Sequence, residues 1–263
     1  LLLRPKNSLV NQSLDAKEFR LRVNCDGFGV AWYAADRGEP VRFRTVTPAW
    51  NNQNLRSIAP ATESRCVLAH VRAASPGLPV VETNCHPFCH NDLVFCHNGL
   101  VGGFGRARRA LLRGLTDHAF ADIEGTTDSE LVFAYVLDEH RARGSGATGA
   151  DLAAALEAAI RRVVEIAGDE PSYLNLCVTN GTAIAASRFS TDPDGQTSSL
   201  YVHRGRRYTC EDDEVCRMVD GGADEPTAIV ASERLSDDPG WEAFPVDHVA
   251  AIEADGSMEF RAF

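Results

Sequence analysis

Two short motifs in the chain carry groups that could bind a carboxylate and polarise a carbonyl. Arg72 follows the apolar run 66–71, and its planar guanidinium can hold a carboxylate through two parallel hydrogen bonds, a geometry that lysine cannot copy. An ordinary surface salt bridge is the alternative role for this arginine. Asn98 and Gly99 follow the apolar run 93–97, where a side-chain amide and an unhindered backbone N–H could stabilise a tetrahedral oxyanion. Asn-Gly is also a common hairpin turn, so both interpretations stay open from these residues alone.

A third motif places a carboxylate at the predicted start of a helix. Thr127 and Glu130 form a capping-box pattern, so the helix should begin at Asp128. This carboxylate could pair with the α-ammonium group of an amino acid. Its structural alternative is a favourable interaction with the helix dipole, worth about 0.3–1 kcal/mol. Each motif is weak by itself, and the three together favour a site for an amino-acid headgroup.

Strands at both ends of the chain and helices in the middle are the elements that must position these groups. Apolar residues recur every three or four positions from Asp151 to Ala167, and Gly168 follows as a C-cap, which predicts a helix. This order indicates an α+β or layered fold. Runs rich in β-branched and aromatic residues predict strands at 28–34, 41–46, 66–71, 93–97, 173–179, 183–187, 200–203, 228–231 and 249–252.

Length and charge limit the organisation and the partners of the chain. The 263 residues contain no internal repeat or long linker, so a single domain spanning 1–263 is expected. The formal net charge of −11 argues against a nucleic-acid partner, because such binding depends on Lys and Arg neutralising phosphates. The basic cluster Arg106–Arg113 has helical spacing, and we interpret it as a solvated face rather than a binding patch. No apolar run has the length that a membrane span requires.

The eight cysteines do not form the pattern of a small disulfide scaffold. We therefore expect reduced thiols and a cytoplasmic location. The pairs Cys85-His86, Cys89-His90 and Cys96-His97 carry groups that zinc prefers. Their C-x3-C-x6-C spacing differs from the paired C-x2-C of zinc ribbons, so neither a metal nor another cofactor is expected.

Motifs along nearly the whole chain resemble the class II glutamine amidotransferase domain, a type of N-terminal-nucleophile hydrolase. More narrowly, the chain is similar to the amidotransferase-like subunit of the fungal glutathione-degradation complex and to the γ-glutamyl amidohydrolases of ergothioneine synthesis. The string from Thr47 to Leu55 is the most specific, because general amidotransferases lack it. The segments that carry the resemblance are Arg4-Pro5, 8–13, 26–30, 47–55, 70–73, 82–88, 97–99, 127–130 and 230–233.

The resemblance implies a fold and a role for each candidate residue. The fold would be a four-layer α/β/β/α sandwich, with the first strand and its nucleophile absent from the chain. Arg72 would bind the substrate α-carboxylate, Asn98 and Gly99 would form the oxyanion hole, and Asp128 would hold the α-amino group. The nucleophile would be an N-terminal cysteine upstream of Leu1, whose own α-amine serves as the base.

Departures from the family pattern leave two points open. Either the cysteine precedes Leu1, or the protein has lost it and binds without cleaving. Cys25 is not expected to replace it, because an internal cysteine lacks the free amine. Ser232 and Glu233 either line the site or close a strand.

The leading hypothesis is an amidohydrolase that cleaves the γ-glutamyl amide of glutamine or of a γ-glutamyl thiol such as glutathione through a cysteinyl thioester. A peptidase-like subunit would be its partner. The alternative is a catalytically inactive glutamyl-binding or structural subunit. A glutaminase that supplies ammonia to a synthase is a third possibility, for which the chain contains no synthase domain.

Overall fold

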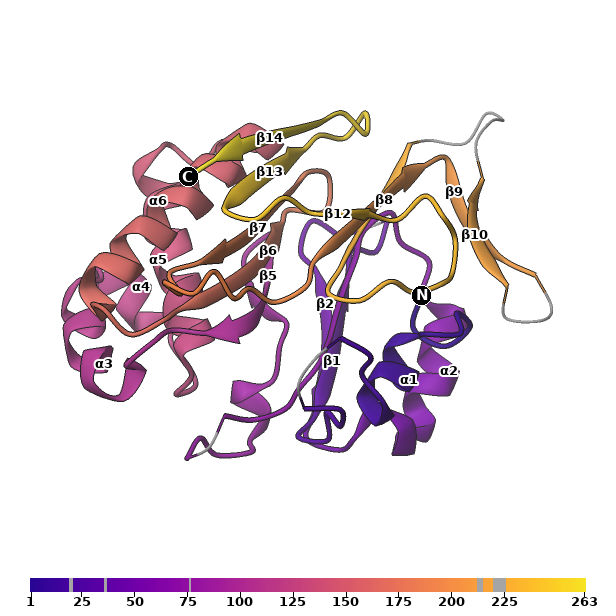
Figure 1. Cartoon of the computed structure of the whole chain (residues 1–263), viewed down its shortest axis with the longest axis horizontal. Helices are drawn as coiled ribbons and strands as arrows, with labels where there is room; N and C mark the ends of the chain where they lie inside the picture. The colour runs from indigo at the N-terminus through magenta and orange to yellow at the C-terminus, as the bar shows by residue number, and fades with distance from the viewer. Residues whose placement is uncertain (19–20, 36, 76, 212–214, 220–225) are drawn as a thin grey trace. The chain divides into compact units, whose positions relative to one another are not determined.

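The computed structural model describes residues 1–18, 21–35, 37–75, 77–211, 215–219 and 226–263 (Figure 1). The chain forms two compact units, which are described separately below. Unit 1 comprises Leu1–Pro87, Ser199–Phe244 and Ala254–Ser257, and unit 2 comprises Phe88–Ser198, Pro245–Glu253 and Met258–Phe263. Both units are therefore built from stretches far apart in the sequence. The prediction of a single domain stays a prediction.

Unit 2 is a six-stranded antiparallel sheet with helices packed on it (Figure 1). The strand order is β14-β13-β7-β6-β5-β4, and α6 packs against β7 and β13. The strands are β4 (Phe88–His90), β5 (Leu93–Leu100), β6 (Tyr173–Thr179), β7 (Ile184–Ser190), β13 (His248–Ile252) and β14 (Met258–Ala262). The helices are α3 (Phe104–Arg113), α4 (Asp117–Ala121), α5 (Asp128–Ala142) and α6 (Gly149–Ala167).

The core of unit 2 lies between this sheet and its helices. Phe95 on β5 stacks on Phe133 of α5, with ring centroids 5.0 Å apart. Tyr135 is fully buried, and its hydroxyl donates a hydrogen bond to the backbone oxygen of Leu111. Helix α5 is buried from Asp128 to Asp138, so its first turn belongs to the core.

Helix α6 begins two residues before the predicted Asp151 because Thr148 caps it. The Thr148 hydroxyl accepts a hydrogen bond from the backbone N–H of Asp151, and the Asp151 carboxylate accepts one from the backbone N–H of Thr148. This reciprocal capping box satisfies two N–H groups that would otherwise lack partners at the helix end.

We expect Thr148→Ala to lower the free energy of unfolding by about 1 kcal/mol, because the alanine cannot accept the bond from Asp151. Urea denaturation of the purified protein would measure this change. Thr182→Ala, at an exposed threonine outside a helix cap, is the matched control and should leave the unfolding midpoint unchanged.

Unit 1 contains three smaller sheets and two α-helices in its described residues. In the first sheet, β1 lies between β2 and β3, and the rings of Phe28 and Phe43 meet 5.7 Å apart. The N-terminal residues Leu2 and Leu3 pack on the same cluster as Phe28. The strands are β1 (Phe28–Trp32), β2 (Val41–Thr45), β3 (Val67–Val71), β8 (Tyr201–Gly205), β9 (Arg207–Cys210), β10 (Cys216–Val219), β11 (Thr227–Ala231) and β12 (Glu242–Ala243), and the helices are α1 (Leu9–Leu14), α2 (Gln53–Ala61) and the 3-10 turns η1 (Ala49–Asn51) and η2 (Glu82–Asn84).

The family-specific string 47–55 folds as a compact turn that leads into α2. The Asn52 side chain accepts a hydrogen bond from the backbone N–H of Leu55 at 2.9 Å and donates one to the hydroxyl of Thr47 at 3.0 Å. Leu55 is buried in the core beneath. Local capping and packing therefore account for these residues of the string.

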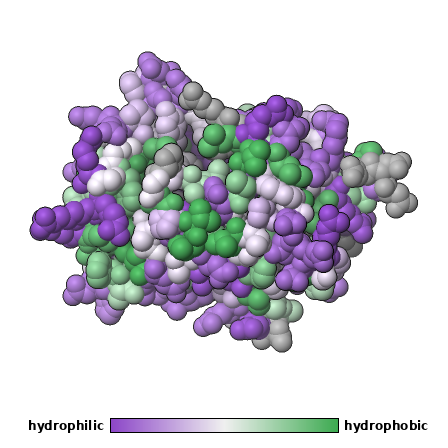
Figure 2. Space-filling model, turned by 90° about the horizontal axis from the view of Figure 1, so that it is seen from below, coloured by the Kyte–Doolittle hydropathy of each residue, from purple (hydrophilic) through white to green (hydrophobic). Residues whose placement is uncertain are grey.

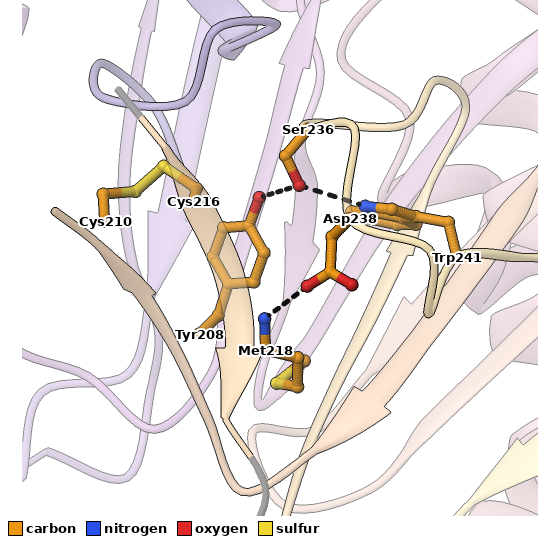
Figure 3. Close-up of a disulfide and its surroundings, with 7 residues drawn as sticks. All are labelled: Tyr208, Cys210, Cys216, Met218, Ser236, Asp238 and Trp241. Carbon is orange, nitrogen blue, oxygen red and sulfur yellow. Dashed lines mark hydrogen bonds between the residues drawn. A yellow bond between two sulfur atoms is a disulfide. The ribbon is translucent and has the colours of Figure 1, made fainter. Parts of the chain in front are cut away.

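The expectation that all the cysteines are reduced thiols is wrong for one pair. Cys210 and Cys216 form a disulfide (Figure 3). The register of β9 and β10 places these two residues directly opposite each other, a relation that cysteine counting along the chain could not detect. The other six cysteines are free thiols.

Two hydrogen bonds hold the strand pair β9–β10 to the loop 235–241, and a third lies within that loop (Figure 3). The Tyr208 hydroxyl donates to Ser236 Oγ at 3.0 Å, and the indole N–H of Trp241 donates to the same oxygen at 3.4 Å. The Asp238 carboxylate accepts from the backbone N–H of Met218 at 2.7 Å and lies 3.1 Å from the buried His203. Partial burial acts to raise the pKa of Asp238, but the backbone N–H groups of Gly240 and Met218 and the nearby His203 outweigh it and hold that pKa below its usual value.

The surface is mixed in character. The face drawn in Figure 2 carries hydrophilic residues over much of its area, with hydrophobic residues in patches among them. Within the described ranges, none of the helices has both the length and the apolar character needed to cross a bilayer.

Candidate functional site

Asn98 and Gly99 lie within a strand and not in a hairpin turn. Strand β5 continues past the predicted end at His97 as far as Leu100. In the register with β6, Asn98 faces Asn175 and Gly99 faces Leu174. Among the described residues, no side-chain hydrogen bond to Asn98 is formed, so its amide is available to a ligand.

The backbone at Gly99 can be occupied only by glycine. Its φ of +148° lies in a region that other residues rarely adopt, and an added Cβ would fall 1.8 Å from the backbone oxygen of Tyr173. The strand end thus comes unusually close to its neighbour β6. A side chain at this position would push the two strands apart.

Asp128 is fixed next to this strand end. It is the first residue of α5, as predicted, and its side chain is buried. One carboxylate oxygen accepts a hydrogen bond from the backbone N–H of Val101 at 2.8 Å, and the other accepts from the backbone N–H of Ser129 at 2.8 Å. The structure therefore brings Asp128 into contact with the segment that follows Gly99.

The Thr127 half of the predicted capping box is present at the start of α5, and the Glu130 carboxylate binds the preceding loop. The Thr127 hydroxyl accepts a hydrogen bond from the backbone N–H of Glu130 at 3.2 Å. The Glu130 carboxylate accepts two more, from the backbone N–H groups of Glu124 and Gly125. These bonds hold the loop before α5 and so help to fix Asp128.

Arg72 belongs to unit 1 and directly follows β3, as the sequence predicts. Its backbone is locked to the start of β1, since its N–H donates to Gly27 and its carbonyl accepts from Asp26, both at 2.9 Å. The side chain is 4% exposed, and one guanidinium nitrogen, Nη2, donates to the backbone oxygen of Pro79 at 3.4 Å. The other, Nη1, is buried and has no hydrogen-bond acceptor among the described residues.

A buried guanidinium nitrogen without an acceptor is costly, because its hydration has been lost without replacement. A ligand carboxylate would supply the missing acceptor. The approach of Arg72 to the candidate residues of unit 2 stays a prediction.

Asp26 is a residue that sequence reasoning gave no role, and it supports the loop after Arg72. Its carboxylate accepts a hydrogen bond from the backbone N–H of Ala74 at 2.7 Å. The neighbouring Cys25 thiol has a pKa raised by loss of hydration and by the Asp26 carboxylate, so it stays protonated and is a poor nucleophile.

Glu233 closes a loop of unit 1. Its buried carboxylate accepts hydrogen bonds from the backbone N–H groups of Lys17 and Glu18, at 2.9 and 3.0 Å. The Asn7 amide donates to it at 3.1 Å. These contacts connect the N-terminal segment to the end of β11 and give Glu233 a structural role.

The cysteine and histidine pairs at 85–97 do not assemble into a metal site. Across the described part of the chain, no group of three or more His, Cys, Asp or Glu side chains could hold a metal ion. Burial raises the pKa of Cys85 and Cys96, which keeps both thiols protonated.

The comparisons with known proteins agree with this fold. The family model "Glutamine amidotransferases class-II" matches residues 4–260. The chain is 36% identical to the probable glutamine amidotransferase DUG3 of Saccharomyces cerevisiae, over 96% of this chain and 77% of the relative. It is 31% identical to the γ-glutamyl-hercynylcysteine sulfoxide hydrolase of Mycolicibacterium smegmatis, over 94% of this chain and 86% of the relative.

Solved structures confirm the predicted α+β fold of the N-terminal-nucleophile type. A glutamine aminotransferase class-II domain protein from Silicibacter pomeroyi superposes with a TM-score of 0.64 at 30% identity, covering 90% of this chain and 91% of that one. The glutamine phosphoribosylpyrophosphate amidotransferase of B. subtilis superposes with a TM-score of 0.57 at 14% identity, over 91% of this chain and 43% of that one, and shows the fold alone. On this sequence match and this fold, the chain belongs to the class II glutamine amidotransferase family.

Proposed function

We propose that the protein is an amidohydrolase that cleaves the γ-glutamyl amide of a γ-glutamyl thiol compound such as glutathione, or of glutamine. Family membership supports an activity on γ-glutamyl amides. The narrower substrate class is favoured by the relative named a γ-glutamyl-hercynylcysteine sulfoxide hydrolase. The relative named a probable glutamine amidotransferase fits glutamine as the alternative substrate. The resemblance to the fungal glutathione-degradation subunit points the same way.

The proposed reaction proceeds through a thioester. The thiolate of an amino-terminal cysteine attacks the γ-carbonyl carbon, and the C–N bond breaks as the leaving amine takes up a proton. Water then hydrolyses the thioester and releases glutamate. The Asn98 amide and the Gly99 N–H stabilise the tetrahedral oxyanion of both steps. Arg72 binds the α-carboxylate and Asp128 the α-ammonium group.

The observation that carries the proposal is the local arrangement in unit 2. The Asp128 carboxylate accepts a hydrogen bond from the backbone N–H of Val101, two residues after Gly99. The end of the same strand carries the Asn98 amide and the glycine. In unit 1, the buried Arg72 supports the same proposal, because it offers a guanidinium nitrogen to a carboxylate.

Location and assembly complete the proposal. The protein acts in the cytoplasm on small γ-glutamyl substrates, with a peptidase-like subunit as partner. Disulfides are rare in cytosolic proteins, so the Cys210–Cys216 disulfide counts against this location. The redox state of Cys210 and Cys216 in protein taken directly from cells, measured by thiol alkylation and mass spectrometry, would therefore test the location.

Release of glutamate tests the activity. We expect the full-length natural protein, incubated separately with glutamine and with glutathione, to release glutamate from both and faster from the γ-glutamyl thiol. A glutamate dehydrogenase assay measures the product. Binding of L-glutamate in calorimetry without release from either substrate would contradict the proposal and support the inactive glutamyl-binding subunit.

A further inference from the structure

His97 is a buried titratable residue that the proposed reaction does not use. It lies on β5 and is 2% exposed, and its ring lies between the start of β6 and the first turn of α5. The two ring nitrogens contact different elements. Nδ1 lies 3.0 Å from the hydroxyl of Ser129 on α5, and Nε2 lies 3.1 Å from the backbone oxygen of Tyr173 on β6.

These partners define how the ring is protonated. A carbonyl oxygen can only accept, so Nε2 must carry a hydrogen that it donates to Tyr173. Burial lowers the pKa of His97 more than the Asp128 carboxylate raises it, which favours the neutral ring. In the neutral ring, Nδ1 is an acceptor. The Ser129 hydroxyl has one hydrogen and lies 3.0 Å from Nδ1 and 3.4 Å from the Asp128 carboxylate, so the shorter contact to Nδ1 takes it.

The ring contacts both candidate groups of unit 2 through these partners. The Tyr173 oxygen that it binds is the atom that excludes a side chain at Gly99, and an added Cβ on Gly99 would fall 2.9 Å from Nε2. On the other side, Ser129 donates its backbone N–H to the Asp128 carboxylate at 2.8 Å. The His97 imidazole thus connects β5, which carries Gly99, to α5, which begins at Asp128.

We propose that His97 is a positioning residue, whose imidazole bridge between Tyr173 and Ser129 fixes Gly99 relative to Asp128. This inference rests on the proposed function. The bridge connects the strand that carries the oxyanion donor to the helix that carries the α-ammonium acceptor. His97 itself touches no substrate and transfers no proton.

Two substitutions separate the halves of the bridge. The side chain of His97→Asn can reach Ser129, because its amide oxygen takes the place of Nδ1, but it is too short to reach Tyr173. The side chain of His97→Gln is longer, so its amide N–H can take the place of Nε2 and donate to Tyr173, while the acceptor for Ser129 is lost.

The bridge predicts that the two variants affect different kinetic constants, kcat in one and KM in the other. We expect His97→Asn to lower kcat for γ-glutamyl hydrolysis about tenfold with KM unchanged, because Gly99 loses its support. We expect His97→Gln to raise KM about tenfold with kcat less affected, because Asp128 loses its support. Ser129→Ala leaves the ring intact and should raise KM in the same way, which keeps the test valid if a His97 variant fails to fold.

A purely structural role predicts a different result. His203 is the matched control, since it is also buried but belongs to unit 1 and contacts Asp238. We expect His203→Gln to lower the thermal midpoint with both kinetic constants unchanged. The inference is wrong if the two His97 variants lose kcat equally at unchanged KM, or if both behave as wild type.

Two measurements test the bridge without turnover. In 15N spectra of histidine-labelled protein at neutral pH, the His97 signal is identified by its absence from the spectrum of His97→Asn. We expect this signal in the wild type to show a protonated Nε2 and an unprotonated Nδ1. Calorimetry should show that His97→Gln binds L-glutamate about tenfold more weakly than wild type. Protonated Nδ1, or unchanged glutamate affinity, would overturn the inference, whereas absence of glutamate release by the wild type would overturn only the proposed function.

Discussion

Gly99→Ala is expected to lower kcat/KM for γ-glutamyl hydrolysis by about 100-fold or more. The alanine Cβ would fall 1.8 Å from the backbone oxygen of Tyr173, so β5 must move away from β6. The Gly99 N–H then leaves its place beside the oxyanion, and loss of one such donor typically costs about 100- to 1,000-fold in kcat. Steady-state kinetics of glutamate release from the full-length protein measure the effect.

A second glycine provides the control for this variant. Gly105 lies in α3, and an added Cβ there meets no other atom within 4 Å. Gly105→Ala should keep wild-type kinetics and unfold at the same or a slightly higher denaturant concentration, because alanine favours the helix. Wild-type kcat in Gly99→Ala would remove Gly99 from the oxyanion site.

Arg72→Lys is expected to reduce kcat/KM for γ-glutamyl substrates by about 10- to 100-fold. The guanidinium donates to Pro79 through Nη2 and keeps Nη1 free for a carboxylate, an arrangement that the single ammonium of lysine cannot reproduce. Hydrogen bonds to charged groups contribute about 1.5–3 kcal/mol, which sets this range. The effect should be largest in KM, since the α-carboxylate is bound in the ground state as well.

Arg162→Lys is the matched control for this variant. Arg162 lies on α6, donates to the backbone oxygen of Gly114 at 2.7 Å and to Glu139 at 2.8 Å, and has no role in the proposed reaction. We expect it to lower stability with kcat/KM retained. If Arg72→Lys also retains kcat/KM, the α-carboxylate is bound elsewhere.

Local patterns in the sequence predicted the parts of the site that depend on nearby residues. The run 66–71 gave β3 and the place of Arg72 at its end. The Thr127 cap gave the start of α5 at Asp128, because the hydroxyl and its N–H partner are three residues apart. The fold class followed from the order of strands and helices together with the family resemblance, and the solved structures confirm it.

Contacts between distant residues could not be predicted in the same way. Asn98-Gly99 has the composition of a turn, and its pairing with Leu174 and Asn175 on β6 makes it a strand. His97 binds Ser129 and Tyr173, which are 32 and 76 positions away, so no local spacing marks it as more than a core residue. The Cys210–Cys216 disulfide depends on a strand register that composition does not reveal.

The discontinuous make-up of unit 2 has a consequence for how the chain folds during synthesis. Strands β13 and β14 are made about 60 residues after β7, yet β13 pairs with β7 along its whole length. The edge of β7 therefore emerges from the ribosome without its neighbour and exposes unpaired backbone groups, a known route to aggregation. Nascent chains stalled before residue 248 should accordingly depend on chaperones more than chains that include β14.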